Sequence, residues 1–382
     1  MVAVCAAGEV HITDTKGKRK KKNISKIVCI HLTKERYYIK ISFVAVLVTD
    51  VRLAQLDRAF GYGPKGRGFE SSSAREWKPR KRRCLRGFLF ESILCEYGII
   101  NRSLLMIQGK QKKIAAINDL SGYGRCALTV SIPVISHMKI QCCPVPTSIL
   151  SNHTGYEEYF FDDYSERLTD YLAMWEKLDL TFDGIMSGFL GSGKQIEIVE
   201  YFIKKFTKEG TKVIIDPVMG DHGKIAGTYT EEMCIQMRRL VSLADIITPN
   251  LTEACRLTDT PYKEKGWKKK ELLTMAETLC GMGPDKIVIT GIPQGEFIAN
   301  YVYEKEENPH FIKTHRVGEE RCGTGDLFAA IVAADAVNGV PFQKSVKKAS
   351  GFVKKSLIKS TEMEIPKKNG VCFEEILHLL KA

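Results

Sequence analysis

The stretch Val213-Ile-Ile-Asp-Pro-Val-Met-Gly-Asp221 decides the fold class. It opens with a short β-branched run, and polar residues follow at once. Such runs are typical of strands buried on both faces of a parallel sheet. The chain has four more runs of this kind, at 114–117, 184–186, 245–248 and 286–289.

Amphipathic segments separate these runs and predict helices over 195–208, 231–243 and 268–281. Alternating strands and helices predict an α/β fold, a three-layer sandwich with a central, mostly parallel sheet flanked by helices. We also expect an antiparallel pair at 297–304 and 310–316. Further helices are expected at 325–338, 345–356 and 373–380. Because 106–382 contain neither an internal repeat nor a linker, we expect them to form one domain.

The charge of the chain is concentrated in its first quarter. The net charge is +12, but residues 1–105 hold 22 of the 57 Lys and Arg and only 9 of the 45 Asp and Glu. The remainder is almost neutral, so its composition does not indicate nucleic-acid binding. No segment approaches the roughly 18 apolar residues of a membrane span. The 12 Cys show no zinc-ligand spacing, which favours reduced thiols in a cytoplasmic protein.

Residues 1–105 do not have the pattern of a domain, because no helical or strand period is sustained there. Back-translation of 54–59 and 68–71 gives sequences similar to the two conserved arms of a transfer-RNA gene. We therefore predict a spurious or disordered N-terminal extension, with the protein starting near Met106. The alternative is a basic arm that binds RNA or a membrane surface. The DNA upstream of codon 106 distinguishes the two.

Polar residues follow the predicted strands, at the sheet edge where ligands bind in α/β proteins. They occur at 118–122, 216–221, 248–253 and 290–291. Four such segments together predict a binding site at this edge.

The segment Gly323-Thr-Gly-Asp326 runs directly into an apolar helical pattern, so it lies at a helix N-terminus. Free N–H groups and the helix dipole make such a place an anion site. Asp326 in the first turn is suited to take a proton from an alcohol. An ordinary helix start with an N-terminal Asp explains the pattern equally well.

Asp216, Asn250 and Glu253 offer the oxygen ligands that Mg²⁺ prefers near phosphate groups. Asn250 and Glu253 are three residues apart and can face one side of a helical turn. Taken alone, this spacing favours a different interpretation, in which the two residues form a capping box.

Two further patterns point to other chemistry. Residues 188–194 have the spacing of a P-loop, but Gln195 stands where the loop needs Ser or Thr. We interpret the segment as a loop on the substrate side. His153 is a general base by residue type, although a His packed in a turn is the commoner case.

Four motifs together resemble those of the pyridoxal/pyridoxamine kinases, in the ribokinase-like superfamily. They are Ser-Asn-His-Thr-Gly-Tyr at 151–156, Asp-Pro-Val-Met-Gly-Asp at 216–221, Ala-Asp-Ile-Ile-Thr-Pro-Asn-x-x-Glu at 244–253 and Gly-Thr-Gly-Asp-Leu-Phe at 323–328. The resemblance implies that 106–382 form a kinase domain. It also implies transfer of the ATP γ-phosphate to the 5′-hydroxymethyl group of pyridoxal, pyridoxamine or pyridoxine.

The resemblance also implies residue roles. Asp326 would be the base, beside the N–H groups of Gly323, Thr324 and Gly325. The site for ATP and Mg²⁺ would comprise Asp216, Asp221, Thr248, Asn250, Glu253, Thr290 and Gly291, with Asp216 and Glu253 as the metal ligands. The substrate would contact Asp119, Ser121, Thr154, Gly155 and Phe189, and either Asp119 or Ser121 would meet the pyridine ring. The family further suggests a homodimer and leaves room for a monovalent cation, with no nucleic-acid or membrane partner.

Some features depart from the family pattern. The turn at 118–126 is two residues shorter than usual, and Phe189 stands where many members have Tyr. The nearest alternative is hydroxymethylpyrimidine (phosphate) kinase of thiamine synthesis, but those enzymes typically have Cys in place of Asp326 and lack the 151–156 motif. A sugar kinase would need an additional lid sheet. An RNA-binding protein with a degenerate kinase body is the alternative from another class.

Overall fold

The structure, a computed structural model, describes residues 8–13, 19–24, 34–35, 38–39, 111–227 and 229–381. The first four ranges are two antiparallel pairs, β1 (Gly8–Thr13) with β2 (Arg19–Ile24) and β3 (Lys34–Glu35) with β4 (Tyr38–Ile39). Most of residues 1–105 lie outside the described residues. The spurious or disordered extension therefore stays a prediction.

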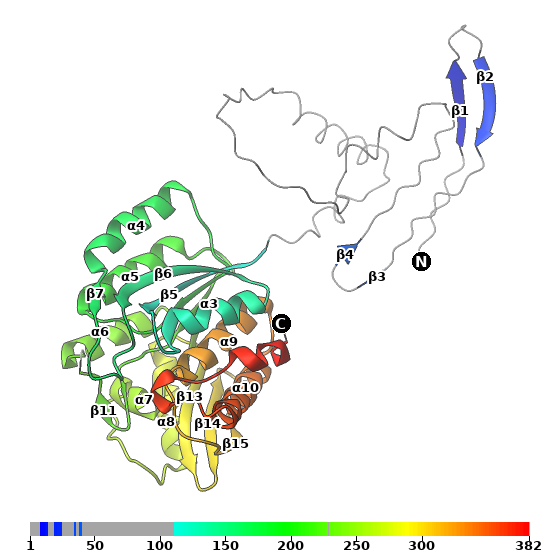
Figure 1. Ribbon diagram of the computed structural model, residues 1–382. Helices are drawn as coiled ribbons and strands as arrows, with labels where there is room; N and C mark the ends of the chain where they lie inside the picture. Colours follow the sequence, from blue (N-terminus) through cyan, green and yellow to red (C-terminus); the bar gives the residue numbers. More distant parts are fainter. Residues whose placement is uncertain are drawn as a thin grey trace. The chain divides into compact units, whose positions relative to one another are not determined.

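A nine-stranded sheet runs through residues 111–381, in the order β15-β14-β13-β12-β9-β8-β5-β6-β7 (Figure 1). The inner strands from β13 to β6 are parallel, while β14, β15 and β7 run antiparallel to their neighbours. The strands are β5 (Lys113–Ser121), β6 (Gln141–Leu150), β7 (Phe161–Asp163), β8 (Gly184–Ser187), β9 (Lys212–Ile215), β12 (Ile246–Ile247), β13 (Lys286–Gln294), β14 (Phe297–Glu304) and β15 (His310–His315).

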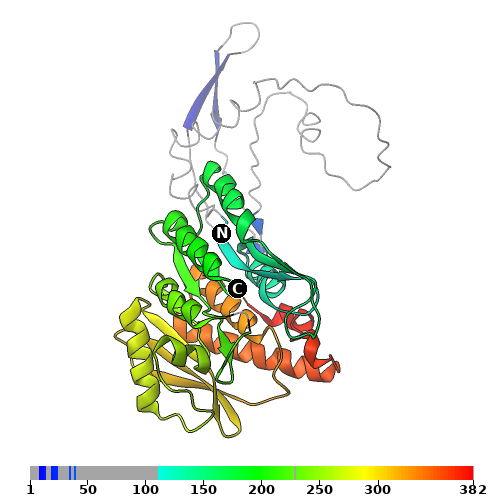
Figure 2. The same ribbon diagram turned by 90° about the vertical axis from the view of Figure 1, so that its left-hand side faces the viewer.

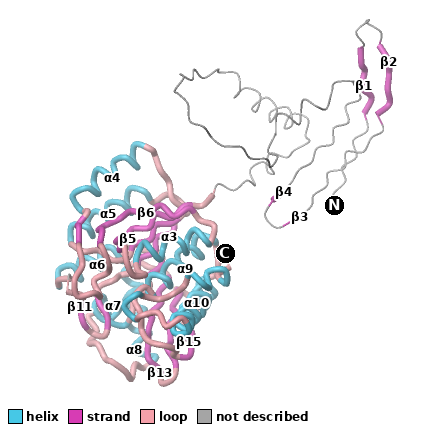
Figure 3. Tube along the Cα trace, viewed as in Figure 1, coloured by secondary structure: helices cyan, strands magenta, loops and turns pink. Residues whose placement is uncertain are grey.

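Helices cover both faces of this sheet (Figures 2 and 3). One layer contains α3 (Ala127–His137), α9 (Thr324–Asn338) and α10 (Phe342–Glu362). The other contains α4 (Ser165–Lys177), α5 (Gly193–Phe206), α6 (Glu231–Val241), α7 (Leu251–Leu257) and α8 (Lys269–Met282). Successive residues of a strand point to opposite faces. Accordingly Ile114 and Ala116 pack in the first core, and Ala115 and Ile117 in the second. The predicted three-layer α/β sandwich is confirmed.

Two strands extend further than the sequence predicted, and this corrects the position of several site residues. β5 continues past 117 because its pairing with β6 resumes after a register shift between Asn118 and Leu120. Asn118, Asp119 and Ser121 therefore lie within the strand and not after it. β13 likewise continues past 289 across a shift between Ile289 and Ile292, which places Gly291 in a bulge with φ +73°.

The helices show similar differences from the prediction. The helix expected at 373–380 is a 3₁₀ helix, η3 (Glu374–Leu379). The helix α10 extends beyond the predicted range 345–356 at both ends. A second 3₁₀ turn is η2 (Lys367–Asn369), and a small hairpin joins β10 (Gly220–Asp221) to β11 (Lys224–Ile225). The sequence did not predict α3, because the helix contains Pro133 and a run rich in β-branched residues. Within the described ranges, no helix is long and apolar enough to span a membrane.

Candidate active site

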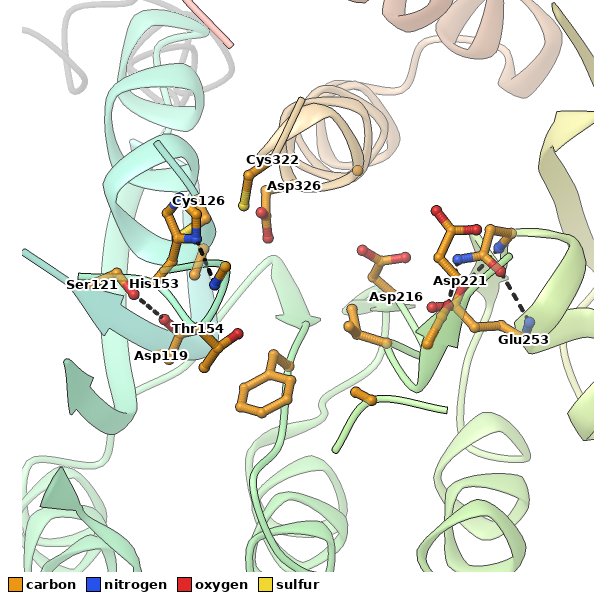
Figure 4. Close-up of a pocket in the computed structure, with 18 of the residues that line it drawn as sticks. Asp119, Ser121, Cys126, His153, Thr154, Asp216, Asp221, Glu253, Cys322 and Asp326 are labelled. Carbon is orange, nitrogen blue, oxygen red and sulfur yellow. Dashed lines mark hydrogen bonds between the residues drawn. The ribbon is translucent and has the colours of Figure 1, made fainter. Parts of the chain in front are cut away.

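A cavity of about 600 Å³ lies where the polar strand ends meet the start of α9. Most of the predicted site residues line it, namely Asp119, Ser121, Thr154, Gly155, Phe189, Asp216, Asp221, Thr248, Asn250, Glu253, Thr290, Gly325 and Asp326. Gly291, Gly323 and Thr324 are not part of the lining. Figure 4 shows an Asp119 side, with Ser121 and His153, and a Glu253 side, with Asp221. Asp326 and Asp216 lie between the two sides.

Asp326 is the third residue of α9, and donors from two other parts of the chain hold its carboxylate. The amide of Asn118 donates to its Oδ1 over 3.2 Å, and the backbone N–H of Ala127 also bonds to the carboxylate. Burial raises the pKa of Asp326, while these donors oppose the rise by stabilising the charge. A carboxylate with this environment is suited to accept a proton near neutral pH.

Asn118 joins three parts of the site. Its Oδ1 accepts the N–H groups of Asp119, at 3.0 Å, and of Phe189, at 2.9 Å, while its amide donates to Asp326. The side chain is 2% exposed. The sequence placed Asn118 among the strand-end polar residues but did not predict this role, because its partners are up to 208 positions away.

The backbone geometry around Asp326 explains why glycine stands at position 323 and why Ala127 has a positive φ. Gly323 precedes α9 with φ +83°, and a Cβ there would lie 2.1 Å from the carbonyl oxygen of Arg125. Only glycine fits this close approach. Ala127, the first residue of α3, has φ +49°, which is unfavourable for a residue with a Cβ. In this conformation the N–H of Ala127, at the start of α3, points to the carboxylate of Asp326 at the start of α9.

The Glu253 side is built around a capping box. The Asn250 side chain accepts the Glu253 N–H at 3.0 Å, and Glu253 Oε2 accepts the Asn250 N–H at 2.7 Å. Glu253 Oε1 accepts the N–H of Met219 at 3.2 Å. The capping interpretation is therefore confirmed, and both residues also line the cavity. Burial, together with the charge of Asp216, raises the pKa of Glu253 well above its usual value.

Asp216 follows β9 and accepts a hydrogen bond of 2.7 Å from Thr248. Burial raises its pKa to about 7, and the charge of Asp326 adds to the rise. Within the described ranges, no cluster of three His, Cys, Asp or Glu forms a complete metal cage. Mg²⁺ in nucleotide sites commonly has one or two carboxylate ligands and otherwise phosphate and water oxygens. Asp216 and Glu253 therefore fit a phosphate-bound Mg²⁺ better than a resident structural ion.

On the Asp119 side, Ser121 donates a hydrogen bond of 2.9 Å to Asp119. Burial raises the pKa of Asp119 to about 7, and the charge of Asp326 contributes. The pair presents a buried carboxyl to the cavity, next to Thr154, Gly155 and the ring of Phe189.

His153 is packed in the loop after β6. Its Nδ1 accepts the N–H of Gly155 at 3.0 Å, so Nε2 carries the hydrogen and donates to the carbonyl of Lys368 at 2.7 Å. Both ring nitrogens are thus engaged, and the ring is 7% exposed. The interpretation as a His packed in a turn is confirmed.

The P-loop-like segment has a structural explanation. Ser192 caps α5 by accepting the N–H of Gln195, and the Gln195 amide is buried against Thr147 and Asp163. A magnesium-binding hydroxyl has no place at 195. Phe189, in the same segment, lines the cavity, and its place on the substrate side stays a prediction.

The sequence did not predict three residues that bring chemistry to the cavity wall, namely Cys126, Lys224 and Cys322. Lys224 lies on the hairpin after the Asp-Pro-Val-Met-Gly-Asp motif, and Cys322 directly precedes Gly323. The positions of Lys224 and Cys322 next to recognised motifs could have indicated that they line the site. Among the described lining residues, Lys224 is the single lysine or arginine beside five carboxyl groups.

Comparison with known proteins gives concordant matches. The family profile described as phosphomethylpyrimidine kinase matches residues 131–371. A candidate phosphomethylpyrimidine kinase from Bacteroides thetaiotaomicron, in a crystal form with pyridoxal, is 37% identical, with a TM-score of 0.68. That match covers 71% of this chain and 96% of the other. Pyridoxal kinase from Lactobacillus plantarum is 25% identical, with a TM-score of 0.66, over 71% and 97% of the two chains.

Among curated proteins, pyridoxal kinase of Arabidopsis thaliana is 31% identical over 202 residues, or 50% of this chain. The match spans 62% of the Arabidopsis protein, so the chain covers less than two thirds of its length. The bifunctional thiamine biosynthetic enzyme TH1 of the same plant is 26% identical over 252 residues, which is 64% of this chain and 46% of that enzyme.

Proposed function

The chain belongs to the ribokinase-like family of pyridoxal and phosphomethylpyrimidine kinases, and from this we propose that it phosphorylates the 5′-hydroxymethyl group of vitamin B6 with ATP. The observation that carries the proposal is Asp326, a half-buried carboxylate at the start of α9, which faces the cavity between Asp119 and Asp216. The presence of pyridoxal in crystals of the Bacteroides relative supports a B6 vitamer as substrate.

In this proposal Asp326 takes the proton of the substrate hydroxyl as the oxygen attacks the γ-phosphate. Asn118 and the N–H of Ala127 fix the orientation of the carboxylate. Burial keeps its pKa above the usual range, which makes it a better base than an exposed Asp. Positioning of this kind provides most of the catalysis in phosphoryl transfer.

Charge on the transferring group would be stabilised by the free N–H groups in the first turn of α9. Lys224 adds a positive charge to a wall that is otherwise acidic. Bound Mg²⁺ would neutralise phosphate charge, and Asp216 and Glu253 are the residues that would hold it. On the Asp119 side, the Asp119–Ser121 pair would meet a polar ring atom and Phe189 would stack on the ring.

A hydroxymethylpyrimidine kinase is the second candidate, favoured by the description of the matching family profile and by the similarity to the thiamine enzyme. The two substrates share a hydroxymethyl group on an aromatic ring, so the same base would act on either. Asp at 326 and the 151–156 motif favour vitamin B6. We extend the proposal to a cytoplasmic homodimer whose partners are ATP and a B6 vitamer.

The test is ADP release by the full chain with Mg-ATP and pyridoxal, pyridoxamine, pyridoxine or hydroxymethylpyrimidine. We expect turnover with at least one vitamer, and a loss of about 10²–10⁴-fold in kcat for Asp326→Asn. Asp170→Asn makes the same chemical change on the exposed face of α4 and should have wild-type activity. Turnover with hydroxymethylpyrimidine alone would replace the proposal by the second candidate, and full activity of Asp326→Asn would refute the role of Asp326.

A further inference from the structure

Two thiols lie on the cavity wall and have no part in the mechanism above. Cys126 directly precedes α3 and is 7% exposed, whereas Cys322 directly precedes Gly323 and is half-buried. Both line the cavity, and Figure 4 shows them close to Asp326. The cysteines come from segments almost 200 residues apart, so the fold alone brings them together.

The backbones that carry the two cysteines are in direct contact. The residue after Cys322 is Gly323, whose missing Cβ leaves room for the carbonyl of Arg125, the residue before Cys126. The carbonyl of Cys322 accepts the N–H of Val371 at 3.1 Å, and Gly370 packs against Arg125. These contacts hold both segments in place on either side of the thiols.

The two side chains also interact. Cys322 contributes most to the raised pKa of the Cys126 thiol, an effect that requires the two side chains to lie close together. A disulfide requires neighbouring backbones and Cβ atoms that point toward each other. The backbone contact meets the first requirement, and both side chains extend to the same cavity wall beside Asp326.

We propose that Cys126 and Cys322 form a reversible disulfide that inactivates the cavity. The oxidant is a peroxide. The Cys322 sulfur, the more exposed of the two, attacks one peroxide oxygen, which gives a sulfenic acid and releases water. The Cys126 thiol then attacks the sulfenic sulfur, so that the S–S bond forms and a second water leaves. Two electrons from the two thiols reduce the peroxide, and a thiol reductant reverses the reaction by exchange.

The link would disturb the base. Cys126 is followed by Ala127, whose N–H bonds to Asp326, and Cys322 lies four residues before Asp326 on the other segment. An S–S bond of about 2 Å brings the two sulfur atoms well inside nonbonded distance, so at least one of the two segments must shift. A displacement on the order of 1 Å in a positioning group lowers rates about 100-fold. The Cys126 thiol also lies near the charges of Asp119 and Asp326, at the place where the alcohol would enter.

The test treats the full chain with hydrogen peroxide and compares it with untreated protein. We expect a cross-linked pair of Cys126 and Cys322 peptides, two hydrogens lighter than the free pair, in a non-reducing digest. Kinase activity should fall in proportion to the cross-link, by about 100-fold at completion, and return with dithiothreitol. Each variant is compared with its own untreated form. Cys126→Ser and Cys322→Ser should form no link, whereas Cys280→Ser, a half-buried cysteine on α8, should respond like the wild type.

Several outcomes would overturn the proposal. One is that the two peptides stay unlinked after peroxide treatment. A related outcome is oxidation of Cys322 to sulfinic acid without any link to Cys126. Another is equal and reversible inactivation of Cys322→Ser. The inference rests on the proposed function only for the activity measurement. The peptide masses need no turnover, so an absent B6 kinase activity would leave the disulfide test intact.

Discussion

The two sides of the cavity are built from contacts of different range. On the Glu253 side, the central hydrogen bonds join residues three apart in the capping box. On the Asp119 side, Asn118 reaches Asp326 across 208 positions, and His153 reaches Lys368 across 215. One side is therefore a local motif that docks on the sheet, whereas the other exists only after the first and last thirds of the domain have met.

This difference has a consequence for robustness. A capping box forms with its helix, so the Glu253 side needs few tertiary contacts to take its shape. The Asp119 side depends on a buried amide with three partners, and each partner left without its bond costs about 1–3 kcal/mol. We expect substitutions on the Asp119 side to affect catalysis most, and those on the Glu253 side to affect nucleotide binding.

Among the substitutions that test this comparison of the two sides, Asn118→Ala should have the largest effect. The change removes the donor to Asp326 and leaves the N–H groups of Asp119 and Phe189 without their acceptor. We expect kcat to fall by about 10–100-fold, because the base loses its orientation. The free energy of unfolding should fall by about 2–6 kcal/mol, because two N–H groups lose their acceptor. Steady-state kinetics and denaturant unfolding measure the two effects.

Asn118→Asp is the matched variant, since it keeps an acceptor oxygen for both N–H groups but replaces the donor with a second carboxyl beside Asp326, where like charges repel. It should lower kcat as Asn118→Ala does but with a smaller loss of stability. Unchanged kcat in both variants would show that Asp326 does not need Asn118.

The next effect tests the Glu253 side. Glu253→Gln keeps the size of the side chain but leaves one of the N–H groups of Met219 and Asn250 without an acceptor. We expect the KM for ATP to rise about tenfold, while the KM for the vitamer changes little. A larger change for the vitamer than for ATP would contradict the division of the cavity into two sides.

How far the sequence predicted the site follows the same division. Asn250 and Glu253 were found because a capping box is a short spacing, and Asp326 because it begins an apolar helix. Asn118 and His153 could be noticed but not assigned, since their partners lie more than 200 residues away. The strand ends at Ser121 and Gln294 were misplaced, because register shifts depend on the neighbouring strand and leave no local pattern. The layer order, in contrast, follows from the alternation of strands and helices.

The Asp119 side and the middle of the cavity, where Asp216 lies, share one electrostatic property that a pH titration can test. The carboxyls of Asp119 and Asp216 have a pKa of about 7 in the folded chain, against an ordinary value of 3.8. Between pH 4 and 7 the folded chain therefore holds protons that the unfolded chain has released. The free energy of unfolding should fall as the pH rises through this range, by at most about 1.4 kcal/mol per pH unit for each group.

Asp119→Asn and Asp216→Asn should each flatten this dependence, because an amide does not titrate. Denaturant unfolding at pH 5 and pH 8, without nucleotide or magnesium, measures the slope. A variant whose slope equals that of the wild type would show that the replaced carboxyl keeps an ordinary pKa. Equal flattening by both variants would indicate that burial dominates the pKa at both positions.

The smallest catalytic effect is expected for His153→Ala. The ring is packed so closely that a Cβ on Gly124 would lie 2.3 Å from it, and its removal leaves the N–H of Gly155 without an acceptor. We expect the unfolding free energy to fall by about 2 kcal/mol and the vitamer KM to rise a few-fold, with kcat within about threefold of the wild type. A general base would behave differently. Its loss would lower kcat by about 10²–10⁴-fold and remove a titration from the pH–rate profile, whatever the stability. The ratio of the kcat and KM effects thus separates a residue that shapes the Asp119 side from one that moves the proton.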